Sequence, residues 1–294
     1  MRYCSGYKKT LNASITTSLD YISHLVDALP PAVFVSSTTF TTNPQVNAYF
    51  ASVPEIRETF SNSTELRDFF NTLENINADE AYALLCMNES EKTVLGMELH
   101  EDIIQREVMQ TTLDFSEHKI LSPASNEAEV RKGIKQCIFD GLITHALHQI
   151  IALKHQKREL EIQHSILVTR LKARLSQSSG LNSLLAHTAD SSLLMDIEQE
   201  ISENEKQLQT LPASWESLQY YLDVIKDTLS HPEKFIRIKT KSFNLNKMKV
   251  VVSDNTSPSV NNVHFNEILI ANVLKKVITI VHYPRSEILP RQKF

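Results

Sequence analysis

Residues 126–175 read NEAEVRKGIKQCIFDGLITHALHQIIALKHQKRELEIQHSILVTRLKARL and contain no proline. Asn126 can cap the start of a helix, and Glu129 three residues later completes a capping box. Apolar residues then recur at helical spacings, which predicts one helix about 70 Å long at ~1.5 Å per residue. The predicted seam comprises Phe139, Ile143, Leu147, Ile150, Leu153, Leu160, Leu167 and Leu171.

A second helical segment supplies a partner for this seam. Its apolar positions follow a heptad spacing and continue beyond Pro212, which can begin a new helix. The positions are Leu194, Ile197, Ile201, Asn204, Leu208 and Leu211, followed by Trp215, Leu218, Leu222 and Ile225. Together, residues 126–230 predict a long antiparallel coiled-coil hairpin.

The two seams fix a register. In an antiparallel pair, the numbers of two residues that face each other have a nearly constant sum. A sum of 368 places an apolar residue of the first helix opposite an apolar residue of the second in eight layers, such as Leu160 with Leu208 and Leu147 with Tyr221. The same sum places His164 opposite Asn204, a polar layer that typically specifies register at some cost in stability. A ligand or pH-switch role for that layer is the alternative.

Charges agree with this register. The first helix carries Arg170, Lys172 and Arg174 near its end. The second begins with an acidic group, namely Asp196, Glu198, Glu200, Glu203 and Glu205. Such exposed pairs contribute only a few tenths of a kcal/mol each, so they select orientation more than they stabilise.

Small residues mark where the first helix meets the rest of the protein. Gly133, Cys137 and Gly141 form a stripe at i, i+4 and i+8. Because glycine inside a helix costs roughly 0.5–1 kcal/mol relative to alanine, we expect another backbone to pack closely there.

The regions flanking the hairpin predict an α+β fold. Residues 1–125 form an N-terminal α+β region, residues 126–230 the hairpin, and residues 231–294 a basic, β-rich region that packs with the N-terminal one. In the N-terminal region, helices capped by Ser52 and Asn62 are predicted. The other elements expected there are a helix over 11–29, a hairpin of strands 82–87 and 93–99 turning at 88–92, and a strand over 108–115.

In the C-terminal region, strands are predicted over 235–240, 248–252, 267–271 and 276–283. We expect the two β-rich regions to complete one sheet.

Composition points to a soluble, cytoplasmic protein without a membrane segment. Cys4, Cys86 and Cys137 lie far apart and are odd in number, which favours reduced thiols over a disulfide framework. No apolar run approaches the ~18 residues that a membrane span needs. The N-terminus lacks the apolar core of a signal peptide.

A basic ribbon is the first candidate binding surface. Residues 231–294 hold 11 Lys and Arg against 4 Asp and Glu. Strand alternation places Arg237, Lys239 and Lys241 on one face, and pairing through Asn244–Asn246 would add Lys247 and Lys249. Five such cations could bind the phosphates of a nucleic acid; a solvated or protein-facing surface is the alternative.

The expected tip of the hairpin is the second candidate. Leu181, Leu184 and Leu185 lie at a turn far from any core, and exposed apolar clusters often mark protein contacts. Closure of the hairpin end, or packing in a dimer, is the alternative for these leucines.

Catalytic, cofactor and metal motifs are not expected. His145, His148 and His155 share helix faces but lack carboxylate or cysteine partners at ligand spacing. The chain's 5 glycines form no phosphate-binding loop.

The first hypothesis is therefore a non-enzymatic interaction or scaffold protein that uses the coiled-coil arm for protein contact or self-association. A nucleic-acid-associated protein is the second hypothesis, and an enzyme of another type is the third.

Overall fold

The protein is described by a computed structural model. It covers residues 7–100, 103–178, 189–211, 218–246, 248–252, 260–271 and 273–290. The contacts divide the chain into a sheet unit, residues 15–142 with 231–294, and a helical unit, residues 1–14 with 143–230. Within the described ranges, no helix is both long and apolar enough to cross a lipid bilayer.

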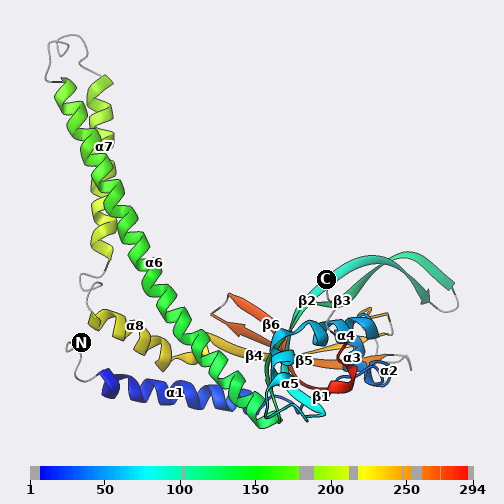
Figure 1. Cartoon of the computed structure of the whole chain (residues 1–294). Helices are drawn as coiled ribbons and strands as arrows, with labels where there is room; N and C mark the ends of the chain where they lie inside the picture. The colour runs from blue at the N-terminus through cyan, green and yellow to red at the C-terminus, as the bar shows by residue number, and fades with distance from the viewer. Residues whose placement is uncertain are drawn as a thin grey trace. The chain divides into compact units, whose positions relative to one another are not determined.

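The chain is α+β, with a long helix between two groups of strands (Figure 1). The helices are α1 (Tyr7–Asp27), α2 (Thr39–Thr42), α3 (Pro44–Tyr49), α4 (Val53–Asn62), α5 (Thr64–Asn71), α6 (Glu127–Ser178), α7 (Ala189–Thr210) and α8 (Leu218–Ser230). The strands are β1 (Val33–Phe34), β2 (Glu80–His100), β3 (Ile103–Ala124), β4 (Ile236–Leu245), β5 (Asn261–Ile270) and β6 (Leu274–Pro284).

One sheet joins strands from both ends of the sequence. Its order is β3-β2-β6-β5-β4, with antiparallel neighbours, and β1 pairs with β6 in parallel. β2 and β6 pair from Glu80 with Pro284 to Met87 with Val277. The prediction that the two β-rich regions complete one sheet is confirmed.

The two faces of the sheet bury different helices. Alternate residues of β2 and β6, such as Leu85 and Val281, pack with α3–α5 in the main hydrophobic core. On the opposite face, α1 buries Ile22 and Val26, and the Tyr21 hydroxyl donates a hydrogen bond to the Ile236 carbonyl at 3.0 Å. Nearby, Arg131 of α6 donates to the carbonyl oxygens of residues 26, 29 and 30, which joins α6 to the end of α1.

The hairpin of β2 and β3 is longer than predicted. Residues 88–92, expected to form its turn, lie within β2 and pair with residues 112–116. β3 accommodates this length through three bulges at residues with positive φ, Glu107, Glu117 and Ser122. The turn prediction was wrong because partners distant in sequence satisfy these polar side chains within the strands: Glu89 pairs with Lys241 of β4, and Lys92 pairs with Asp114 of β3.

Other local predictions met mixed outcomes. Asn126 accepts a hydrogen bond from the Glu129 amide, and Ser52 caps α4, as expected. α5 is capped by Ser63 instead of Asn62, because Asn62 is still helical in α4. Residues 248–252 make only isolated bridges to Leu245 and Thr112, while β4 pairs with β5.

The buried stripe of α6 differs from the predicted seam in its first half. It recurs every fourth residue, at Val130, Ile134, Ile138, Leu142, Ala146 and Ile150. Of the predicted seam, Leu147 is instead 45% exposed. The prediction assumed a helical partner throughout, whereas α6 up to Leu142 belongs to the sheet unit.

Two glycines of the small-residue stripe face the sheet. A Cβ on Gly133 would lie 3.1 Å from the Ser122 Cβ, and one on Gly141 would lie 3.7 Å from the Ile270 Cγ2. Cys137, between them, is exposed. A methyl group at Gly133 would therefore need Ser122 to shift by a few tenths of an ångström, while Gly141 has room for one.

Replacing each glycine by alanine should separate these two environments. Gly141→Ala should raise the free energy of unfolding by about 0.5–1 kcal/mol, since helix propensity improves without a clash. Gly133→Ala should give a smaller gain or a loss, because Ser122 must move. Denaturant unfolding of both variants measures the difference, and equal gains would contradict the close approach at Gly133.

Candidate functional site

α6 and α7 form an antiparallel helical pair within the helical unit (Figure 1). Leu160 of α6 and Ile197 of α7 are buried, as the predicted seams require. The Asn204 side-chain amide donates to the Leu160 carbonyl at 3.2 Å. The pair thus has a defined apolar seam with one polar residue inside it.

Asn204 is the most constrained polar group of this pair. It is only 6% exposed, and its Oδ1 has no hydrogen-bond partner among the described residues. An unsatisfied buried acceptor costs roughly 1–3 kcal/mol. Asn204 therefore lowers the stability of the isolated hairpin.

His164, which is predicted to lie opposite Asn204 in the polar layer, contacts a different side chain of α7. Its Nε2 is 3.3 Å from the Glu205 Oε1, one residue beyond Asn204. The His164 side chain is 34% exposed. The two predicted residues thus occupy neighbouring positions without a hydrogen bond between them.

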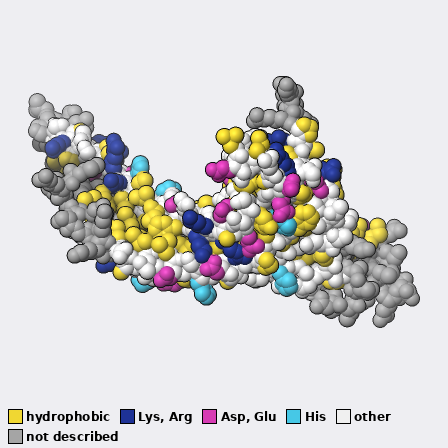
Figure 2. Space-filling view, turned by 60° about the horizontal axis from the view of Figure 1, so that its bottom comes forward, with side chains coloured by type: hydrophobic (Ala, Val, Ile, Leu, Met, Phe, Trp, Pro, Cys, Tyr) yellow, Lys and Arg dark blue, Asp and Glu magenta, His cyan; other side chains and the backbone are white. Residues whose placement is uncertain are grey.

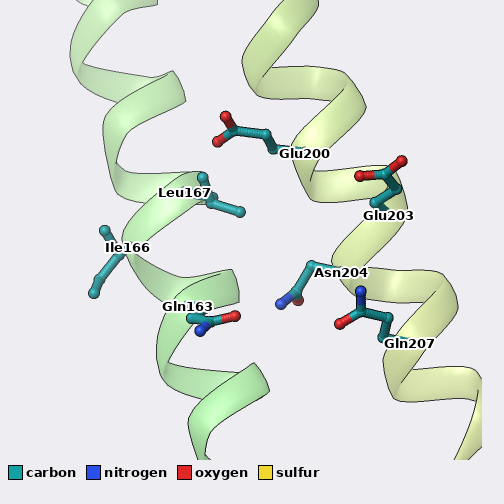
Figure 3. Close-up of a pocket in the computed structure, with 7 residues that line it drawn as sticks. All are labelled: Gln163, Ile166, Leu167, Glu200, Glu203, Asn204 and Gln207. Atoms are coloured by element: carbon teal, nitrogen blue, oxygen red, sulfur yellow. The ribbon is translucent and has the colours of Figure 1, made fainter.

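A groove of about 320 Å³ opens between the two helices at this level. It is lined by Gln163, Ile166, Leu167, Glu200, Glu203, Asn204 and Gln207. In Figure 3 the Asn204 amide points across the gap toward α6, between the side chains of Gln163 and Leu167. Leu167 points toward α7 in the same view, among amide and carboxylate side chains, whereas Ile166 projects from the side of α6 that lies away from α7.

Apolar residues remain exposed around the groove. Ile162 is 52% exposed and Ile166 60%, and Leu175 and Met195 lie nearer the end of the pair with 50% and 69% exposure. Figure 2 shows hydrophobic side chains gathered on the visible face of the helical unit. The exposed isoleucines lie outside the predicted seam, and their β-branched apolar character at i, i+4 was a signal that the sequence already contained.

The charges near the groove do not pair as expected. In the described part of the chain, Arg170, Lys172 and Arg174 form no ion pair, although α7 presents acidic residues at the same level. Asp196, Glu198, Glu200 and Glu203 are likewise exposed and unpaired. The hairpin therefore carries a free basic set on α6 and a free acidic set on α7.

The second half of the predicted seam is only partly observed. Lys154 of α6 lies over the Tyr221 ring of α8, with Nζ 4.7 Å from the ring centre. Leu218, predicted to face Ile150, is 53% exposed. Trp215 and the tip leucines Leu181, Leu184 and Leu185 lie outside the described residues.

The predicted basic ribbon is partly neutralised by carboxylates. Arg237 and Lys239 are exposed on β4, but Lys241 Nζ lies 2.6 Å from the Glu89 Oε2 and 2.8 Å from the Glu267 Oε2. Lysines on an edge strand such as β4 also hinder edge-to-edge aggregation.

The remaining ribbon residues do not extend the free basic surface. Lys249 donates to the Phe50 carbonyl at 3.0 Å, outside any strand. Lys247 lies outside the described residues. Lys241 and Lys249 thus make contacts within the sheet unit and are not available to bind a ligand.

Sequence reasoning missed one assembled polar group, centred on His118. Its ring is buried and stacks on Phe50, and its Nε2 lies 2.8 Å from the Tyr49 carbonyl, so Nε2 must carry the proton. The Nδ1 lies 3.7 Å from the Glu55 Oε1. With a carbonyl and a carboxylate as its neighbours, His118 ties α3 and α4 to β3.

The described residues form no assembled catalytic or metal site. No three His, Cys, Asp or Glu side chains there gather closely enough to hold a metal ion. Burial raises the pKa of the Cys86 thiol to about 12, which disfavours the nucleophilic thiolate.

Lys241 should be the structurally important cation of β4. Lys241→Met should lower the free energy of unfolding by about 2–3 kcal/mol, because it leaves the buried Glu89 carboxylate without a counter-charge. Lys239→Met, on the same face of β4, should change it by less than about 0.5 kcal/mol. Urea unfolding midpoints test this, and equal effects would contradict the network.

The network should also set a pH dependence. Burial raises the pKa of Glu267, but Lys241 and Lys275 outweigh this effect and hold it below the usual 4.5. Burial lowers the pKa of Lys241, but Glu267 and Glu89 outweigh it and hold it above 10.5.

The stabilisation is therefore complete between pH 4.5 and 10.5, and is lost as pH falls through the depressed Glu267 pKa or rises through the raised Lys241 pKa. The difference in unfolding free energy between the wild type and Glu267→Gln should be flat in that range and shrink in acid. A difference that grows in acid would contradict this assignment.

Among these features, the α6–α7 groove combines exposed apolar residues, an unsatisfied buried acceptor and unpaired charges of both signs. Comparison of the chain with protein-family models, curated proteins and solved structures finds no match.

Proposed function

We propose that this is a non-enzymatic interaction or scaffold protein, and that the α6–α7 hairpin, packed as a coiled coil, is its protein-contact surface. The observation that carries the proposal is the exposure of Ile166, which lines the groove, and of Ile162, one turn before it on α6; both are more than half exposed. A two-helix pair buries only one stripe of each helix, so a further apolar stripe remains available to another chain.

The energetics favour an occupied groove. Because each isoleucine is already about half covered, burying the remainder would contribute on the order of 1 kcal/mol per side chain. This gain needs a second polypeptide, because both isoleucines are more than half exposed in one chain.

The tip leucines belong to the same proposal. Leu181, Leu184 and Leu185 would extend the contact surface beyond the described end of α6. Their replacement by serine should leave folding intact and change assembly.

Nucleic-acid binding through β4 receives less support. Of the described ribbon cations, Arg237 and Lys239 are exposed without a carboxylate partner, whereas Lys241 meets two carboxylates and Lys249 donates to the Phe50 carbonyl. Because affinity for phosphate backbones grows with the number of contacts, two cations offer little.

A cytoplasmic location is part of the proposal. Cys86 and Cys137 are free thiols, and Cys137 is exposed. Exposed free thiols are typical of reducing compartments.

Site-specific photo-crosslinking tests the contact surface. A photo-reactive phenylalanine analogue at position 162 or 166 of the full chain, expressed in its native cells, should give discrete protein adducts. The same group at position 161, where the glutamate side chain is 54% exposed on another face of α6, is the control and should give none. The absence of adducts at 162 and 166 would refute the proposed function.

A further inference from the structure

We propose that the partner of the hairpin groove is a second copy of this chain, packed about a two-fold axis parallel to α6 and α7. This inference rests on the proposed function and names the chain that occupies the groove. It is carried by the unpaired charges of the hairpin, together with the exposed Ile166 that lines the groove.

The groove face carries one sign of charge on each helix. Ile166 lines the groove, and Arg170 lies one turn further along the same side of α6. Glu200 and Glu203 line the groove from α7. None of these three charged side chains has a partner in the described chain.

This arrangement is self-complementary. A two-fold axis along the helices places α6 of each copy against α7 of the other at the same level, so the basic set of one chain meets the acidic set of its partner. A face-to-face packing about an axis perpendicular to the helices places α6 against α6 and α7 against α7. That packing opposes like charges, so electrostatics select the parallel axis.

The same packing covers the exposed side chains of the groove. Gln163 and Gln207 line the groove with side-chain amides that can donate hydrogen bonds to a second copy. Ile162 and Ile166 of both chains become central apolar residues of a four-helix bundle.

Light scattering coupled to gel filtration of the full chain tests the assembly. The mass of the wild type measured by light scattering should be twice that of one chain. Ile166→Glu should raise the dimer Kd by about tenfold or more, since it buries a charge in the apolar centre. Met109→Glu, on β3 at a residue 77% exposed, is the matched control and should leave the Kd unchanged.

Charge reversal tests the axis. The double variant Glu200→Lys with Glu203→Lys, and the double variant Arg170→Glu with Arg174→Glu, should each lose the homodimer. Mixed together, they should form a heterodimer, because each reversed helix then faces a reversed partner. Fluorescence energy transfer between labelled variants measures this rescue, and each variant's circular dichroism verifies folding.

The outcomes distinguish this inference from the proposed function. A monomeric wild type whose photo-adducts at 166 contain another protein would overturn the homodimer and retain the contact surface. A dimer insensitive to Ile166→Glu, or double variants that do not rescue each other, would also overturn it. A monomer without adducts would refute both.

Discussion

The antiparallel pairing of β2 with β6 is the interaction on which the sheet unit depends. It joins residues 80–87 to residues 277–284, and everything between them in the sequence must leave and return to the same sheet. The long α6 helix therefore begins against the sheet, where the missing side chain of Gly133 leaves room for Ser122 at a bulge of β3. It then continues into the helical unit. Loss of this pairing would remove the central strands that carry both hydrophobic faces.

The sheet and the helical pair differ in where their charges lie. In the sheet, Lys241 is held between Glu89 and Glu267, so most of the charge taken out of water is compensated, although the Glu89 Oε1 has no hydrogen-bond partner among the described residues. In the hairpin, the Asn204 Oδ1 is likewise buried without a partner, but the charged side chains around it are exposed and unpaired in the described part of the chain. The charges of the sheet therefore form an internal network, whereas those of the hairpin face solvent.

The charges of β4 illustrate how a functional signal can have a structural cause. Strand alternation correctly places Arg237, Lys239 and Lys241 on one face. Yet the carboxylates that meet Lys241 come from β2 and β5, distant in sequence, and one of them is a buried glutamate that no local pattern singles out. The apparent ribbon thus loses much of its free charge once the strands pair.

What the sequence by itself determined was local and periodic: the long uninterrupted helix after Asn126, the apolar positions Leu160 and Ile197, and the strand of residues 277–281. These follow from propensity, capping and the 3.6- or two-residue repeat. Tertiary structure alone decided what lies opposite each element. The first half of α6 buries Ile138 and Leu142 in place of Phe139 and Ile143 because its neighbour there is the sheet unit, and periodicity cannot name a neighbour. Likewise, only the fold shows that Ile166 and the Asn204 acceptor meet in one groove, since that depends on how two helices are rotated against each other.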